Sequence, residues 1–153
     1  MKIKAGQFNA YRKLLHWGKP SPSGKGSCRL WVNRGRKGSL TTAVEGAARL
    51  GFGNAYAVGS TNICDGQWHH VVAVYKGGTS KKLANTVSIY IDGNLDHLSA
   101  RKDGIPYINT NSASSRPLSI GSMEYACDID ELYVIEGALS QDEVMQLFTK
   151  NRL

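Results

Sequence analysis

The sequence predicts an all-β fold of antiparallel strands with one short helix near its C-terminus. Residues 65–75 carry apolar side chains on both alternating faces, which is typical of a central strand that is covered on both sides. Residues 86–98 alternate more cleanly around Asp92-Gly93, a dipeptide that favours a type I′ hairpin turn because both central positions have positive φ. The middle of the chain is therefore predicted to be antiparallel β-structure.

The flanking segments are predicted to supply more strands, joined by loops rich in Gly, Pro and Ser. A basic turn at residues 34–38 is expected to join two of these strands into a basic hairpin. Residues 45–64 contain several glycines, which favour short strands and loops over a helical turn at residues 45–50. Strands are expected at residues 11–18, 28–33, 39–44, 117–121 and 128–135, with a short one at residues 107–108 inside a long loop at 99–116.

The helix is predicted from its capping residues. Ser140 and Glu143 have the spacing of a capping box, in which each side chain accepts a hydrogen bond from the other residue's backbone amide. Val144, Leu147 and Phe148 follow at helical spacing and form one apolar stripe. This stripe is expected to dock the helix on the sheets.

Length and composition predict one domain over residues 1–153. The chain has 41% hydrophobic and 20% charged residues, which is ordinary for a globular domain of one core. No stretch approaches the roughly 18 apolar residues of a membrane span. Residues 1–7 lack the apolar core of a signal peptide, so the sequence predicts either a cytoplasmic chain or one whose leader has been removed.

The net charge of +7 is concentrated at one end of the sequence. Residues 1–50 carry eleven Lys and Arg against one acid, Glu45, which gives +10, whereas the remainder carries −3. A basic segment of this kind attracts polyanions such as sulfated polysaccharide, nucleic acid or anionic lipid, and the alternative is a solvated face without a specific partner. Nucleic acid is not expected, because no recognition helix, zinc spacing or aromatic ribonucleoprotein motif is present.

The three cysteines, Cys28, Cys64 and Cys127, allow at most one internal disulfide. The chain has no C-x-x-C spacing, which argues against a zinc site. Two alternatives remain: three reduced thiols, or a bridge between Cys64 and Cys127, each of which precedes a predicted strand.

Five motifs resemble the ordered landmarks of laminin-G-like, concanavalin A-like lectin/glucanase jelly rolls. The resemblance spans residues 64–149 and implies an antiparallel two-sheet jelly-roll β-sandwich whose C-terminal segment packs near the N-terminal one. It also implies an extracellular or cell-surface location. The motifs lie at residues 65–71, 89–93, 118–121, 129–134 and 138–144.

The chain differs from the family at its N-terminus, where such domains usually have a further strand or two. Either Lys2 to Phe8 supplies a shortened first strand, or one sheet edge is left open. An open edge exposes unpaired backbone groups and invites pairing with another chain, so a homodimer or a protein partner is the alternative to ligand binding.

No catalytic residue is predicted. Laminarinase-type relatives of this fold carry a Glu-x-Asp-x-Glu pattern that places two carboxylates on one strand face, and the chain lacks it. Asp128 and Asp130 alternate, but Leu132 and Val134 continue their face and predict core, so Asp130 is interpreted as structural. A degenerate glycoside hydrolase is the remaining enzymatic alternative. His69 and His70 are adjacent and point oppositely on a strand, so they cannot bind one metal together.

Calcium is implied by the resemblance alone, because several members of the superfamily hold this ion. Calcium takes six to eight oxygen ligands, which Asp and Asn supply well. Asp130 matches the family's ligand, and Asp65 and Asp128 are weaker candidates at the rim of the sandwich.

The predicted function is a non-catalytic, lectin-like carbohydrate-binding module, with anionic polysaccharide as one ligand class. Sugar sites combine an aromatic plate for the apolar pyranose face with planar polar groups for its hydroxyls. Trp68 is assigned to the core, and Trp31 is placed opposite the apolar residues of its strand. The candidate ligand-binding residues are Trp17, Trp31, Asn33, Arg34, Arg36, Tyr56 and Tyr107.

Overall fold

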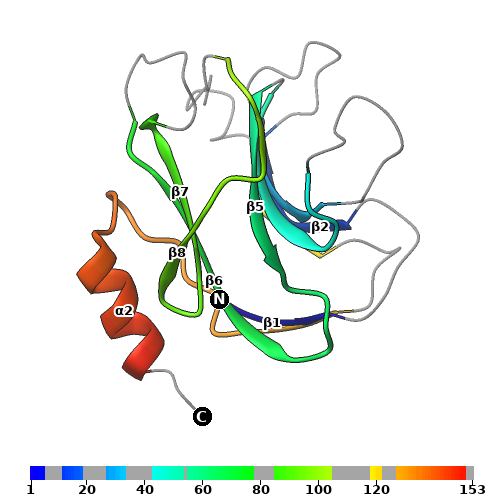
Figure 1. Ribbon diagram of the computed structural model, residues 1–153. Helices are drawn as coiled ribbons and strands as arrows, with labels where there is room; N and C mark the ends of the chain where they lie inside the picture. Colours follow the sequence, from blue (N-terminus) through cyan, green and yellow to red (C-terminus); the bar gives the residue numbers. More distant parts are fainter. Residues whose placement is uncertain are drawn as a thin grey trace.

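The computed structural model is a sandwich of two antiparallel sheets with one helix outside it (Figure 1). The predicted all-β jelly-roll class is confirmed. The structure describes residues 1–5, 12–18, 27–33, 43–53, 55–77, 85–104, 118–121 and 127–150. The basic turn at residues 34–38 and the predicted short strand at residues 107–108 lie outside these ranges.

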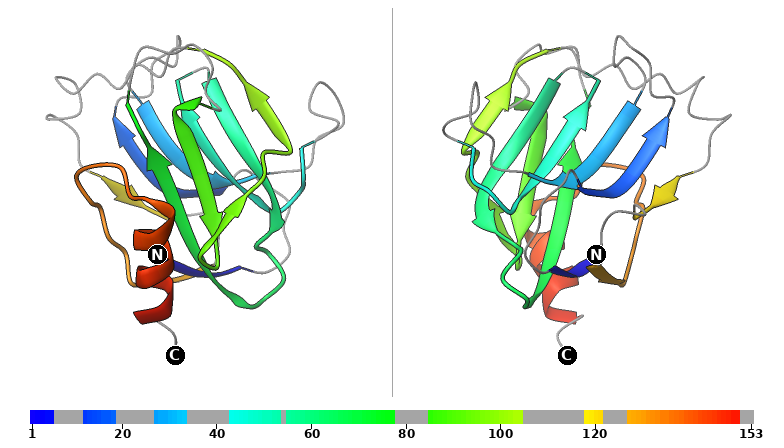
Figure 2. Two further views of the ribbon diagram at one scale, coloured as in Figure 1. Left: turned by 60° about the vertical axis from the view of Figure 1, so that its left-hand side comes forward. Right: turned by 90° about the vertical axis from the view of Figure 1, so that its right-hand side faces the viewer.

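The first sheet has five strands in the order β11-β1-β6-β7-β8. β1 pairs with β11 on one side and with the start of β6 on the other, so the N-terminal and C-terminal segments lie side by side (Figure 2). The short N-terminal segment thus supplies the first strand. The strands are β1 (Lys2–Ala5), β6 (Trp68–Tyr75), β7 (Val87–Ile91), β8 (Asn94–Asp96) and β11 (Cys127–Asp130).

The second sheet has six strands in the order β10-β2-β3-β4-β5-β9. All of its pairings are antiparallel. The strands are β2 (Arg12–Gly18), β3 (Ser27–Val32), β4 (Ala47–Phe52), β5 (Ala55–Asn62), β9 (Ala100–Lys102) and β10 (Ser119–Ile120).

The predicted hairpin turn and helix cap are both present. Asp92 and Gly93 have φ values of 52° and 79°, as a type I′ turn requires. Helix α2 (Gln141–Lys150) follows Ser140, whose amide donates to the Glu143 carboxylate at 2.7 Å. α2 covers the outer face of the five-stranded sheet, where Val144 packs against Val74 and Tyr90.

The core lies between the two sheets. Leu30, Leu50 and Phe52 point inward from the six-stranded sheet, and Val71 and Ile89 point inward from the five-stranded sheet. Along one side the sheets are tied together by buried Asp96 of β8, whose carboxylate accepts hydrogen bonds from the amides and hydroxyls of Ser60 and Thr61 on β5 at 2.7–3.3 Å.

One prediction for the first half of the chain is wrong and another is confirmed. β3 pairs with β4, and the described part of the strand predicted at residues 39–44, which is residues 43–44, lies in the turn before β4 and not in a strand. Gly46 in this turn has φ 81°, which a glycine adopts without strain. The short strands favoured within residues 45–64 are present as the well-paired strands β4 and β5.

Two predictions for exposed residues are also wrong. β11 ends at Asp130 because Glu131 takes a φ of 53°, so Val134 leaves the sheet and is 63% exposed instead of buried. Trp68 is 43% exposed and does not belong to the core. It shares the outer face of β6 with His70, but Phe148 of α2 stacks on His70 and the helix leaves Trp68 exposed. The cysteines all fall within described residues, and no disulfide joins them.

Candidate functional site

The candidate site is the outer face of the six-stranded sheet. Side chains alternate along each strand, so residues between the inward-facing Leu30, Leu50 and Phe52 point away from the core. Strand register places Lys13, Trp31 and Arg49 directly opposite one another, and it places His16 opposite Arg29 and Tyr56 opposite Lys102. We call this set the basic face; it comprises Lys13, His16, Arg29, Trp31, Arg49, Tyr56 and Lys102.

The centre of the basic face is an arginine between two aromatic rings. The Cζ atom of Arg49 lies 4.8 Å from the ring centroid of Trp31 and 3.9 Å from that of Tyr56. Arg29 lies across from it, with its Cζ atom 5.6 Å from the Trp31 centroid. Gly51 separates these groups on β4, and a Cβ there would lie 3.6 Å from Cζ2 of Trp31. This distance is an ordinary van der Waals contact, so the indole ring packs directly over Gly51.

The charge of this face is reflected in the pKa of His16. Burial lowers the pKa of His16, and the neighbouring cations Arg29 and Lys13 lower it further. Nε2 of His16 and Nε of Arg29 are buried and find no hydrogen-bond partner among the described residues. No Asp or Glu alternates onto the basic face in the described strands. The face therefore offers donors and positive charge but no carboxylate to neutralise them.

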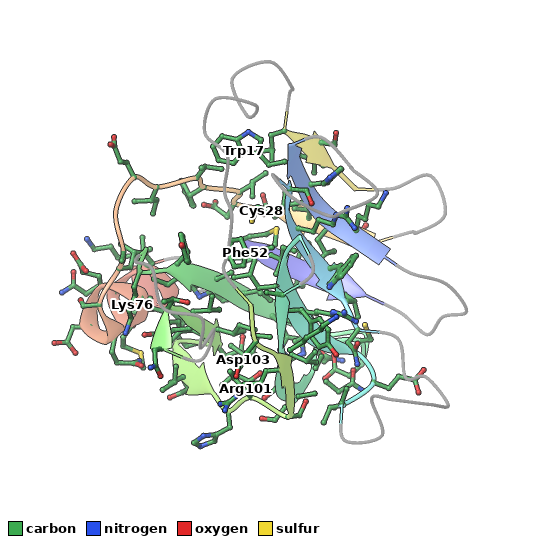
Figure 3. The ribbon with its side chains drawn as sticks, turned by 90° about the horizontal axis from the view of Figure 1, so that it is seen from above. Trp17, Cys28, Phe52, Lys76, Arg101 and Asp103 are labelled. Atoms are coloured by element: carbon green, nitrogen blue, oxygen red, sulfur yellow. The ribbon has the colours of Figure 1, made fainter. Side chains whose placement is uncertain are left out.

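The structure brings together only part of the predicted ligand-binding set. Trp31 and Tyr56 lie on the basic face, whereas Trp17 points to the inner side beside Cys28 and Phe52 (Figure 3). Asn33 is 1% exposed, and its amide group donates to the Val44 carbonyl at 2.8 Å, so it holds the turn before β4. Arg34, Arg36 and Tyr107 lie outside the described residues.

Five residues of the basic face, four cations and His16, were not among the sequence candidates. Arg29 could have been found from the sequence, because it lies two residues before Trp31 and therefore on the same face of the strand. Arg49 was missed because the short strands favoured within residues 45–64 had no predicted bounds. Lys13, His16 and Lys102 needed the pairing register, which the sequence does not contain.

The described residues do not fit a calcium ion. Oδ1 of Asp130 accepts a hydrogen bond from the Glu131 amide at 2.8 Å, and Lys2 lies opposite Asp130 in the register. Asp65 is engaged by the Gln67 amide and His69. No three His, Cys, Asp or Glu side chains cluster for a metal within the described part of the chain. Calcium takes no part in the proposals below.

The two adjacent histidines of β6 have opposite environments, as their alternation predicted. His69 lies between Asp92 at 2.8 Å and Asp65 at 3.1 Å. Burial opposes its charged form, but hydrogen bonds to Asp92 and Asp65 outweigh burial and raise the pKa of His69. Burial lowers the pKa of His70 to about 4, assisted by the N-terminal amino group. His69 therefore links the turn at Asp65 to the turn at Asp92, and His70 is a packed neutral side chain.

Comparison with family models identifies the class of protein. Residues 3–145 match a laminin-G-like model described as the concanavalin A-like lectin/glucanases superfamily. The chain therefore belongs to this superfamily, which includes both lectins and glycosidases. Searches of curated proteins and of solved structures gave no match. In the part of the chain that the structure describes, no helix is long and apolar enough to span a membrane.

Proposed function

We propose that the single domain predicted over residues 1–153 is a non-catalytic carbohydrate-binding module that binds anionic polysaccharide on the basic face. The observation that carries this proposal is the stacking of Arg49 between Trp31 and Tyr56, with Arg29 beside the indole. Aromatic rings bind the apolar face of a pyranose, and guanidinium groups form paired hydrogen bonds with carboxylate or sulfate. Both elements are present within one patch.

The arrangement of the patch favours binding of an extended polymer. Cations are distributed across β2, β3, β4 and β9, so the positive charge runs across the sheet instead of forming one pocket. Cation–π contacts hold the arginines in place before binding, which reduces the side-chain entropy that binding costs.

A binding role is preferred to hydrolysis because of where the carboxylates lie. Glycosidases of the usual type need two carboxylates flanking the scissile bond. The described strands place no carboxylate on the basic face. Asp128 and Asp130 lie on β11, an edge strand of the other sheet.

The test compares two arginines by calorimetric titration with a sulfated oligosaccharide and with a uronate oligosaccharide at about physiological salt. Arg49→Ala is expected to weaken binding by about tenfold to a hundredfold, because charge-assisted hydrogen bonds contribute about 1.5–3 kcal/mol. Arg101→Ala is the matched control. It removes the same charge from β9, where Arg101 lies 3.6 Å from Asp103 and alternates away from Lys102.

Three outcomes are informative. Loss of affinity in Arg49→Ala but not in Arg101→Ala supports the proposal. Equal small losses of affinity in both variants would mean that binding depends on net charge alone. Such electrostatic attraction is screened beyond roughly 8 Å at this ionic strength. Absence of binding to both oligosaccharides and to a wider glycan array would refute the proposal.

A further inference from the structure

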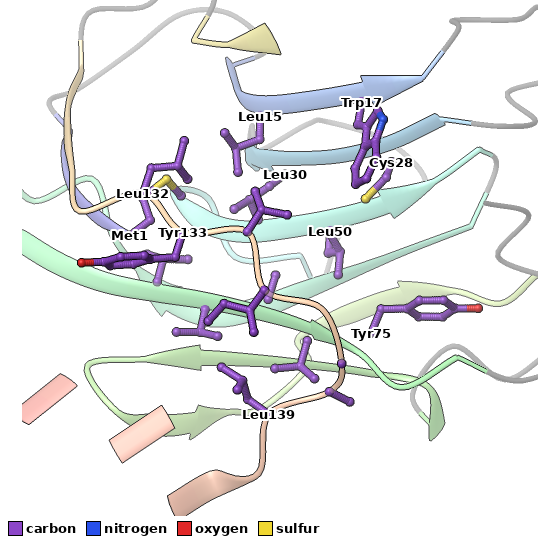
Figure 4. Close-up of a pocket in the computed structure, with 18 of the residues that line it drawn as sticks. Met1, Leu15, Trp17, Cys28, Leu30, Leu50, Tyr75, Leu132, Tyr133 and Leu139 are labelled. Atoms are coloured by element: carbon purple, nitrogen blue, oxygen red, sulfur yellow. The ribbon is translucent and has the colours of Figure 1, made fainter. Parts of the chain in front are cut away.

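Two arginines on neighbouring strands of the basic face share one indole ring. Leu30 and Leu50 line the cavity between the two sheets (Figure 4). Their neighbours Arg29, Trp31 and Arg49 alternate with them and project from the opposite, outer face. The Cζ atom lies 5.6 Å from the Trp31 centroid for Arg29 and 4.8 Å for Arg49, so these two atoms are at most 10.4 Å apart.

The pairing register fixes the points from which the two side chains start. Arg29 pairs with Gly51, and Trp31 pairs with Arg49, so the two arginines are diagonal neighbours across β3 and β4. Diagonal neighbours in an antiparallel pair lie about 7–8 Å apart along the backbone. Gly51 places no side chain between them, and the Trp31 ring packs over it instead. Both guanidinium groups therefore contact the same ring from fixed positions.

No carboxylate of the sheet neutralises this pair of like charges. The six described strands of the sheet contain no Asp or Glu. Lys13 lies opposite Trp31, and His16 lies opposite Arg29, so the nearest groups on β2 add to the positive charge. Like charges at neighbouring positions of a sheet face repel one another. A ligand that brings two negative groups would relieve this repulsion at both arginines.

A ligand can reach these guanidinium groups only through one end. The Nε atoms of Arg29 and Arg49 are buried, and each side chain as a whole is half-buried. Hydrogen bonds to a ligand must therefore come from the terminal Nη atoms, which can bind two oxygens of one anion. A sulfate ester has three terminal oxygens and a carboxylate has two, so a sulfate can contact one arginine and a neighbouring cation together.

We propose that Arg29 and Arg49 together select a polysaccharide that carries sulfate groups on neighbouring sugars, and that Trp31 is the positioning residue that sets their separation. This inference rests on the proposed function, because it names the ligand class of the same basic face. A polymer with one carboxylate on every second sugar presents a single anion to the pair and leaves one arginine without a partner. Sulfates on adjoining sugars engage both arginines at once.

The first test is calorimetric titration of the full chain with three tetrasaccharides of one backbone at about physiological salt. They carry two sulfates on the central sugars, two sulfates on the end sugars, or two carboxylates on alternate sugars. The paired sulfates are expected to bind about tenfold more tightly than either of the others, because one further charge-assisted contact forms. Equal affinities would overturn this inference and leave the proposed function standing. Absence of binding to all three would refute both.

Arginine variants separate the geometry of the guanidinium groups from their charge. Arg29→Lys and Arg49→Lys keep the positive charge but lose the paired donors. Each is expected to reduce the preference for paired over separated sulfates from about tenfold to about twofold. Arg101→Lys, on β9 and directed away from the basic face, is the matched control and should keep the preference. Retention of the full preference in both test variants would overturn the role assigned to the two arginines.

A leucine variant tests the positioning role of Trp31. Trp31→Leu keeps an apolar side chain on β3 but cannot hold a guanidinium group by a cation–π contact. Affinity for the paired sulfates should fall more than affinity for the separated sulfates, and Trp31→Phe, which keeps an aromatic face, should restore the preference. The same loss of affinity for both ligands would mean that the ring only contacts the sugar, and it would overturn the positioning role.

A short polyphosphate with the same charge as the paired-sulfate tetrasaccharide provides the last comparison. It should bind severalfold more weakly, because it offers no pyranose face to the ring of Tyr56. Equal or tighter binding of polyphosphate would mean that the two arginines respond to charge density alone, and it would overturn the assignment to a sulfated sugar.

Discussion

The two faces of the six-stranded sheet present different side chains. The outer, basic face has rings and guanidinium groups stacked across β3, β4 and β5. The inner face has apolar side chains such as Leu30, Leu50 and Phe52, which line the cavity between the sheets. Alternation along the same strands therefore separates a charged surface, which suits an anionic ligand, from an apolar core.

Phe52 is expected to give the largest effect, because it belongs to the apolar inner face. It is 2% exposed, its ring centroid lies 5.0 Å from that of Tyr75, and it lines the cavity. Phe52→Ala should lower the free energy of unfolding by about 3–5 kcal/mol. Tyr56→Ala, on the outer face of β5, should cost less than about 1.5 kcal/mol. Urea unfolding of the two variants measures the difference, and equal losses would contradict the assignment of inner and outer faces.

Trp31→Ala tests the contribution of the aromatic ring to the basic face. Removal of the aromatic plate should weaken anionic oligosaccharide binding by about thirtyfold, or about 2 kcal/mol, because stacking and the positions of both arginines are lost together. The control is Trp68→Ala, which removes an exposed tryptophan from the other sheet. Equal losses of affinity in Trp31→Ala and Trp68→Ala would contradict the assignment of the site to the basic face.

His70 should make the stability of the fold sensitive to acid. Its pKa is about 4 in the folded state, below the ordinary value of 6.5, so the unfolded chain takes up the proton first. Stability is therefore expected to fall as pH decreases from 6.5 to 4, and His69, whose pKa is raised, gives the opposite slope. Unfolding of the wild type and of His70→Gln at pH 7 and pH 5 isolates the His70 contribution. An identical pH dependence in both would contradict it.

His16 should report charge at the basic face with a smaller effect. Its pKa is lowered by burial and by Arg29 and Lys13, and a bound anion offsets the two cations. NMR titration of His16 should show a rise of roughly one unit on binding a sulfated oligosaccharide, which corresponds to about 1.4 kcal/mol. The NMR signals of His97, an exposed histidine outside this face, serve as the control. A fall in the pKa of His16 would place the ligand elsewhere.

The fold was largely predictable because local patterns and long-range pairing agree. The Asp92-Gly93 turn and the Ser140–Glu143 cap depend on neighbouring residues alone, and both were predicted correctly. β4 and β5 were expected only as short strands and loops without bounds, since glycines at 46, 51, 53 and 59 weaken the strand pattern and only pairing with β3 compensates. Trp68 was misassigned because alternation gives a residue's face but not the extent of the helix that covers it.

The candidate site was predictable only where one strand contains the signal. Trp31 and Arg29 lie two residues apart on β3, so their shared face follows from the sequence spacing. Arg49 and Tyr56 join them through register across β4 and β5. Side-chain patterns within one strand do not encode that register.

The most direct test of the carbohydrate proposal uses the indole N–H signals of the three tryptophans in a single NMR titration. Trp31 lies on the basic face, Trp17 lines the cavity, and Trp68 is exposed on the other sheet. Addition of a sulfated oligosaccharide should shift the Trp31 signal and leave those of Trp17 and Trp68 in place. A shift of Trp17 or Trp68 with Trp31 unchanged would contradict the placement of the carbohydrate site on the basic face.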